Sequence, residues 1–133
     1  LIMNSEKTQL LHFRISNKFS NSSHHSLEVL LDDSTVSPSG IVKFLGLILD
    51  ENLNFHHHIE HVTKKISIGI FMLRMLRQTV SAEVLLSAYY GLIYPYLTYA
   101  VPVWGCESQR TLFLFRLQKK STRVIFVLSR HQS

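Results

Sequence analysis

Residues 59–76 read IEHVTKKISIGIFMLRML, and their large apolar side chains recur every three or four positions. Because an α-helix turns once in about 3.6 residues, this spacing places them on one face of a helix. Asparagine is a good N-cap residue, so Asn52 or Asn54 is expected to precede the first turn. The stretch therefore predicts an amphipathic helix that ends near Gln78 and packs its apolar face into a core.

Two more helices are predicted beyond residue 78. Ser81 can cap a helix that is apolar around most of its circumference, so this helix is expected to be central and buried. Pro95 kinks or ends it, because proline lacks the backbone N–H that a helix needs. A short extended piece around 99–104 leads to a third helix, which Ser108 can cap and which runs to about Leu128. This half of the chain predicts a three-helix bundle.

The third helix has two contrasting faces. Its predicted packing face consists of Phe113, Leu114, Leu117, Val124, Ile125 and Leu128. A separate cationic stripe consists of Arg116, Lys119, Lys120 and Arg123. Such a stripe either contacts the phosphates of a nucleic acid or is a solvated helix surface, and the pattern alone leaves both interpretations open. Leu112, Phe115 and Phe126 fit neither face, which suggests a second apolar contact.

The first half of the chain shows strand and turn patterns. Residues 8–15 form a short β-prone run, apolar residues alternate in 27–31, and 41–49 is a nearly continuous apolar run, as in a buried strand. Loop-forming residues fill 16–26, and turns are expected at 32–34 and 37–40. The predicted class is α+β, with a small antiparallel sheet over residues 1–51 followed by a helical bundle over 52–133.

Charge is unevenly distributed along the chain, whose formal net charge is +5. Residues 1–54 carry four Lys and Arg against six Asp and Glu, whereas residues 55–133 carry ten against three. A polyanion such as nucleic acid would therefore meet the second half. The single cysteine, Cys106, excludes an internal disulfide and favours a reducing, intracellular compartment.

One segment raises the alternative of a membrane protein. Residues 84–106 contain no charged side chain and are long enough to cross a bilayer. They also hold all five tyrosines, several of them at mid-span, together with Pro95 and Pro102. Tyrosine belongs at membrane edges, and prolines leave carbonyl groups that neighbouring helices must cover. The pattern therefore disfavours a membrane span.

Two clusters could carry chemistry. His61 lies one helical turn after His57, in a group completed by His56 and His58, but no third ligand is evident, so no metal site is predicted and the role of these histidines is left open. The pair Asp32–Asp33 is of the kind that holds metal ions for nucleotidyl transfer. It falls where a turn is needed, and no further carboxylate follows on a neighbouring strand. No complete active site is predicted.

Three segments carry a family pattern. Residues 4–13, NSEKTQLLHF, contain N-x-x-K-T; residues 42–59 begin VKFLGLILD and continue with LNF and HI; residues 90–125 contain YPYLTY, VWG, LQK and RVI in that order. Together they resemble palm motif D, the primer-grip block (motif E) and the thumb of reverse transcriptases from non-LTR, jockey-like (LINE-type) retrotransposons. The chain departs from the family at Phe55, where tryptophan is usual, and at Ala100, where glycine is common.

The resemblance implies roles for individual residues. Lys7 matches the motif-D lysine that is thought to assist the departing pyrophosphate; it is otherwise an exposed lysine at a strand edge. A hairpin at Lys43, Phe44, Leu45 and Gly46 would steady the primer's 3′ end, with Gly46 permitting close approach; a buried strand with a glycine bulge is the alternative. The thumb cations that would contact a duplex are Lys64, Lys65, Arg116, Lys119, Lys120 and Arg123.

The family's F/Y-A-D-D strand is missing from this chain, so the chain alone is expected to be inactive. Mg²⁺ is implied for the complete polymerase and no cofactor for this chain. The expected partners are an RNA or DNA primer–template duplex and the remaining palm and fingers of the polymerase, and no membrane is expected. Two alternatives are a stand-alone basic helical module that binds nucleic acid or a protein, and a membrane protein.

Overall fold

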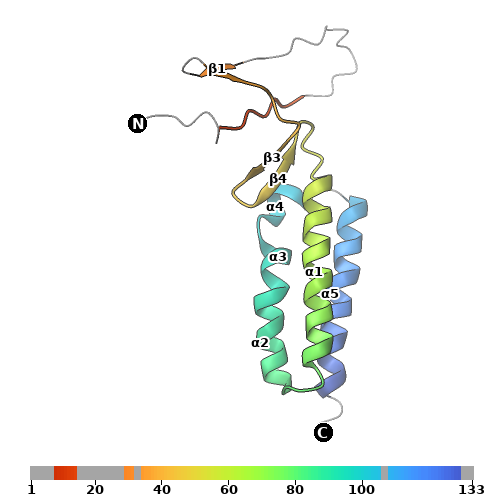
Figure 1. The fold of residues 1–133 in the computed structure, drawn as a ribbon. Helices are drawn as coiled ribbons and strands as arrows, with labels where there is room; N and C mark the ends of the chain where they lie inside the picture. The colour runs from red at the N-terminus through yellow and green to blue at the C-terminus, as the bar shows by residue number, and fades with distance from the viewer. Residues whose placement is uncertain (1–7, 15–28, 32–33, 106–107, 130–133) are drawn as a thin grey trace. The chain divides into compact units, whose positions relative to one another are not determined.

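The computed structural model of the chain describes residues 8–14, 29–31, 34–105 and 108–129 (Figure 1). It has two small antiparallel sheets followed by helices, which confirms the predicted α+β class. Two compact units divide the chain, one over Leu1–His57 and one over His58–Ser133.

The first unit contains two separate two-stranded sheets. One pairs β1 (Val29–Leu31) with β2 (Ser34–Val36), and the other pairs β3 (Ile41–Phe44) with β4 (Leu47–Asp50). The run at 41–49 is therefore not one buried strand but a hairpin, as the resemblance implied for Lys43, Phe44, Leu45 and Gly46. Leu45 and Gly46, with φ of 46° and 83°, form its turn. Two successive left-handed residues match the twist of the flanking strands, and glycine reaches this conformation without a Cβ penalty.

Little apolar surface is buried in the first unit. Among its described residues, Val36 is the only buried hydrophobic side chain, whereas Leu30, Phe44 and Leu45 are 77%, 59% and 74% exposed. A two-stranded hairpin is marginally stable in water unless its apolar face packs on something else. The described part of this unit therefore has no hydrophobic core of its own.

The described residues 8–14 do not form the predicted strand. Leu10 makes one isolated bridge with Pro38, and the Ser39 N–H donates to the Leu10 carbonyl at 2.7 Å. Arg14 anchors the other end of the segment, because its backbone N–H donates to the Glu51 carbonyl and its Nε lies 3.1 Å from the Glu51 carboxylate. The predicted loop at 16–26 and the aspartates at 32–33 lie outside the described residues.

Helix α1 (His56–Leu76) begins later than predicted, so neither Asn52 nor Asn54 is its N-cap. The backbone N–H groups of Asn52 and Asn54 both donate to Asp50 Oδ1, at 3.0 and 2.9 Å. Leu53 and Phe55 have positive φ values. The Asp50 side chain thus holds a tight turn after β4, which delays the start of the helix.

The second unit continues with α2 (Ala82–Leu92), α3 (Tyr94–Thr98), α4 (Val101–Trp104) and α5 (Ser108–Ser129). Ser81 caps α2 as predicted, and its hydroxyl accepts a hydrogen bond from the Val84 N–H. The predicted extended piece at 99–104 is wrong, because α4 is a short helix. Pro95 and Pro102 lie in the first turns of α3 and α4, where proline needs no helical N–H partner, and Ala100 at φ 52° separates the two helices.

The core of the second unit is built mainly on α1 and not, as predicted, on α2. Buried α1 residues are His58, Ile59, Val62, Ile66, Gly69, Ile70 and Leu73. On α2 only Leu85 and Tyr89 are buried, while Val84 and Tyr90 are 51% and 53% exposed. Apolar composition alone did not reveal that one side of α2 faces solvent.

Helices α1 and α5 run in the same direction, and α2 runs antiparallel to both (Figure 1). The helices pack closely at Gly69 of α1, where an added Cβ would lie 2.7 Å from Ile93 Cγ1 and 3.3 Å from the Leu92 carbonyl oxygen. Gly69 therefore lets α1 approach the α2–α3 junction more closely than any larger residue would.

The tyrosine-rich segment does not form one continuous helix. It is divided among α2, α3 and α4. Within the described parts of the chain, no helix is long and apolar enough to cross a bilayer.

Candidate nucleic-acid interface

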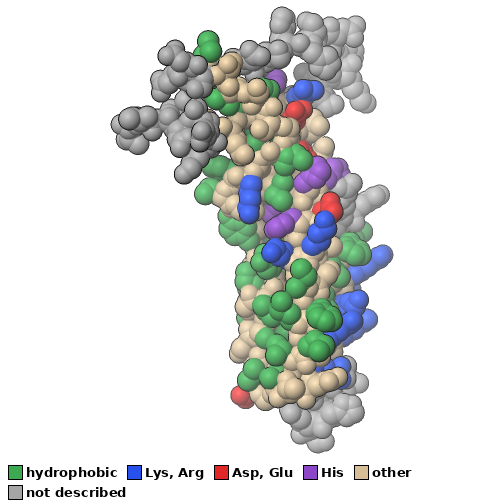
Figure 2. All heavy atoms as spheres, in the orientation of Figure 1, with side chains coloured by type: hydrophobic (Ala, Val, Ile, Leu, Met, Phe, Trp, Pro, Cys, Tyr) green, Lys and Arg blue, Asp and Glu red, His purple; other side chains and the backbone are tan. Residues whose placement is uncertain are grey.

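Four cations from two helices line one open groove of about 640 Å³. Arg74 lies in the last turn of α1 and Arg77 just beyond it, while Lys120 and Arg123 lie on α5. Gln78 and Val124 complete the lining. Figure 2 shows Lys and Arg side chains following one edge of the helical unit. We call this feature the basic groove.

The local sequence explains why these side chains converge. Residues three apart lie on the same side of a helix. Arg74 and Arg77 therefore point to one side, and Lys120 and Arg123 do the same on α5. Leu73 and Val124, each next in sequence to a groove cation, are buried at 0% and 7% exposure. Packing of these two apolar neighbours fixes the rotation of α1 and α5, and this rotation turns the cations toward one another.

Among the described residues, no acidic side chain lines the groove. Helix α5 contains no Asp or Glu at all, and no ion pair to Arg74, Arg77, Lys120 or Arg123 occurs within the described residues. Like charges gathered in this way attract an anion with several negative charges more strongly than isolated surface lysines do. The groove is therefore suited to successive phosphates of a nucleic-acid backbone.

The structure places the predicted cationic stripe on the surface. Arg116, Lys119, Lys120 and Arg123 are all exposed. Of these, Lys120 and Arg123 line the basic groove. Arg116 and Lys119 lie outside its lining on the same helix.

The other predicted contact residues lie elsewhere. Lys64 and Lys65 are exposed on α1, several turns before Arg74, and Lys64 Nζ forms an ion pair with Glu60 at 2.9 Å. The predicted grip residues Lys43, Phe44, Leu45 and Gly46 sit on the β3–β4 hairpin of the first unit and are all exposed. Lys7 lies outside the described residues.

Sequence reasoning missed Arg74 and Arg77 as part of the site. Their three-residue spacing was a usable signal that they share a helix side. That this side meets Lys120 and Arg123 depends on the packing of α1 against α5, which no local pattern encodes.

The packing face of α5 is largely as predicted. Leu114, Leu117, Val124 and Ile125 are buried. Phe113 was also assigned to this face, and this is wrong, because it is 49% exposed. Ser121 instead lies fully buried, since its hydroxyl donates to the Gln118 carbonyl at 2.7 Å and so loses little on leaving water. The Leu128 side chain lies outside the described parts.

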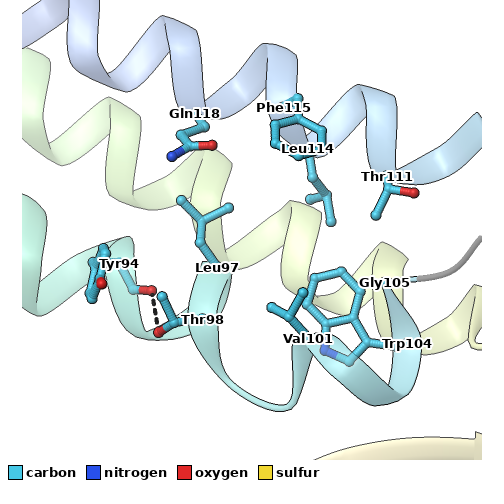
Figure 3. A pocket seen from close by; sticks show the side chains of 10 residues that line it. All are labelled: Tyr94, Leu97, Thr98, Val101, Trp104, Gly105, Thr111, Leu114, Phe115 and Gln118. Atoms are coloured by element: carbon cyan, nitrogen blue, oxygen red, sulfur yellow. Dashed lines mark hydrogen bonds between the residues drawn. The ribbon is translucent and has the colours of Figure 1, made fainter. Parts of the chain in front are cut away.

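A second hollow, of about 180 Å³, lies between α3–α4 and α5 (Figure 3). Two of its polar groups already have partners: the Thr98 hydroxyl donates to the Tyr94 carbonyl at 3.0 Å, and Trp104 Nε1 donates to the Tyr99 carbonyl at 2.9 Å. None of the described residues that line it is charged. This hollow therefore suits a small apolar group and not a phosphate.

The clustered histidines differ in burial. His58 is buried and packs edge-on against Trp104, with ring centroids 5.6 Å apart, whereas His57 is exposed. Within the described residues, no group of three or more His, Cys, Asp or Glu side chains could hold a metal ion. His58 thus serves in the packing of the helical unit.

His58 should make stability depend on pH. Burial lowers the pKa of His58 below its ordinary value of 6.5, and the nearby charge of His61 lowers it further. Below pH 6.5 the unfolded chain therefore binds more protons at this site than the folded chain. The free energy of unfolding should hold its full value above pH 6.5 and fall as the pH drops from there toward the folded-state pKa.

Urea denaturation at several pH values measures this effect. A His58→Phe variant should lose this part of the pH dependence, whereas His57→Phe, at an exposed position, should keep it. Equal pH dependence in both variants would show that His58 is not the responsible group.

No family model, curated protein or solved structure matches the chain in comparisons with known proteins. The function is therefore inferred from the chain's own residues and from the three-segment resemblance.

Proposed function

We propose that the chain is the palm-edge and thumb part of a non-LTR retrotransposon reverse transcriptase, and that it holds a primer–template duplex for a catalytic centre on the missing palm. The observation that carries this proposal is the basic groove, where Arg74, Arg77, Lys120 and Arg123 face one hollow. Contacts of this kind are made to phosphates, so they position a duplex without reading its sequence.

The first unit supports the same proposal. Its β3–β4 hairpin presents Phe44 and Leu45 to solvent at 59% and 74% exposure, at the positions that resemble the primer grip. Gly46 lies in the turn, where a ligand's backbone can approach closely. The scarcity of buried apolar side chains in the described part of this unit is expected of a palm edge that packs on the rest of the palm.

A stand-alone basic binding module is the second candidate function. It is favoured by the independent core of the helical unit, in which Ile66, Leu73, Leu85 and Ile93 are fully buried. Both candidates use the basic groove. An upstream reading frame that encodes F/Y-A-D-D shortly before Lys7 would support the polymerase, and a start codon immediately before Leu1 would support the module.

Replacing groove cations should weaken duplex binding and reduce its dependence on salt. Each phosphate contact contributes about 0.9 to the slope of log K against log salt, so Arg74→Ala/Arg77→Ala should flatten the slope by about 1 to 2. Adding Lys120→Ala and Arg123→Ala should flatten it by about 3 to 4 in total. Fluorescence anisotropy of a labelled duplex, titrated at several salt concentrations, measures both quantities.

Lys64→Ala/Lys65→Ala is the matched control, because these two exposed cations of the same helix, which the resemblance had assigned to the duplex, lie outside the groove lining. This variant should keep the wild-type slope to within about half of one phosphate contact. Equal flattening in both double variants would mean that the charge of the chain, and not the groove, binds the duplex.

A further inference from the structure

The surface of α5 opposite its buried face carries an ordered row of aromatic and cationic side chains. Leu112, Phe115, Lys119, Arg123 and Phe126 follow one another at spacings of three, four, four and three residues, which keeps them on one side of a helix. Leu112, Phe115 and Phe126 are 58%, 58% and 67% exposed, and both cations are exposed. Phe115 also borders the hollow between α3–α4 and α5 (Figure 3). We call this row the aromatic–cationic strip.

The strip has unusual chemistry for a solvated helix surface. Large aromatic rings are normally covered, and here two of them flank two cations. Within the described residues, neither Lys119 nor Arg123 forms an ion pair. Arg123 also lines the basic groove, so the strip and the groove are continuous. A ligand of the strip should therefore combine negative charge with flat apolar surfaces.

Three polyanions can be compared on this basis. A duplex presents phosphates but keeps its base faces stacked inside. An anionic membrane surface needs a helix whose apolar residues are segregated from its charges. In the strip, Lys119 and Arg123 lie between Phe115 and Phe126, so the apolar side chains are not segregated. A single-stranded nucleic acid offers both phosphates and unstacked bases.

We propose that the aromatic–cationic strip binds single-stranded nucleic acid, with Phe115 and Phe126 stacking on bases and Lys119 and Arg123 contacting the phosphates between them. The two rings lie about 16 Å apart along the helix axis, which leaves room for intervening nucleotides. This inference rests on the proposed function, since the strand would continue from the strip into the basic groove through Arg123. It adds a preference for single-stranded over double-stranded nucleic acid, which phosphate contacts in the groove alone would not give.

Stacking predicts a selective loss when the rings are removed. Phe115→Ala/Phe126→Ala should weaken the binding of a labelled oligothymidylate by about tenfold for each ring. Affinity for a duplex of the same length should stay unchanged, and so should the salt slope, because the phosphate contacts remain. The tyrosine variant, Phe115→Tyr/Phe126→Tyr, should restore the oligothymidylate affinity. Anisotropy titrations of the full chain measure all of these.

Phe113→Ala is the matched control, because Phe113 is 49% exposed on the same helix but lies off the strip. It should bind both probes like the wild type. The inference is overturned if the double variant binds oligothymidylate normally, if it loses duplex affinity equally, or if its main loss is in binding to vesicles of phosphatidylserine. If the wild type bound neither the oligothymidylate nor the duplex, the proposed function itself would be overturned. If the wild type bound the duplex and the double variant kept normal oligothymidylate affinity, only the role of the strip would be overturned.

Discussion

Replacing Trp104 with alanine is expected to lower the free energy of unfolding by about 3 to 5 kcal/mol. The indole is 2% exposed, packs on His58 and donates a hydrogen bond to the Tyr99 carbonyl. Truncation would enlarge the apolar hollow that Trp104 already lines. For a domain of this size, such a loss should lower the melting temperature by more than about 10 °C.

Circular dichroism during urea and thermal unfolding measures the effect, because Trp104 is the only tryptophan and its fluorescence is lost in the variant. Trp104→Phe keeps a ring but not the N–H, so it should lose only about 1 to 2 kcal/mol. Val103→Ala changes an exposed neighbour on α4 and should stay within about 0.5 kcal/mol of the wild type. If Trp104→Ala and Val103→Ala unfolded alike, Trp104 could not be part of the core.

Gly69→Val should destabilise the helical unit by about 3 kcal/mol through overpacking. The new Cβ would collide with Ile93, which is itself fully buried and has no free space to move into. To remove this collision, α1 would have to move away from the α2–α3 junction. The expected loss outweighs the few tenths of a kcal/mol that valine gains over glycine in helix propensity.

The same substitution at Gly91 provides the control. An added Cβ there meets nothing within 4 Å, although Gly91 also lies in a helix. Gly91→Val should therefore change the free energy of unfolding by less than about 0.5 kcal/mol. Denaturation curves for the two variants isolate the steric effect, and equal stabilities would contradict the close approach of the helices.

The long helices could be predicted from the sequence because their signals are local. The apolar spacing over 59–76 identified α1, and Ser81 marked the N-cap of α2. Ser108, predicted as the cap of α5, is instead its first residue. The beginning of α1 was mispredicted, because the Asp50 carboxylate accepts hydrogen bonds from the backbone N–H groups of Asn52 and Asn54 and forms a turn there. The apolar residues of 41–50 do not alternate, so their pattern alone predicted one strand, and the hairpin was predicted only from the family resemblance around Gly46.

The candidate site was predictable in part. Helical spacing alone gave the exposed cations of α5 and set Leu112, Phe115 and Phe126 apart from its packing face. Two things required the tertiary structure. One is the partnership of Arg74 and Arg77 with Lys120 and Arg123, which depends on how α1 packs beside α5. The other is the exposure of Phe113 and the burial of Ser121, which helical spacing did not predict.

The parallel course of α1 and α5 bears on how the chain matures during synthesis. Between them, α2, α3 and α4 carry the backbone back along the bundle, so the two halves of the basic groove leave the ribosome at well-separated times. A nascent chain that has only reached α4 holds two arginines of the groove and none of its α5 cations. The complete basic groove therefore forms only once α5 has been made and has packed beside α1.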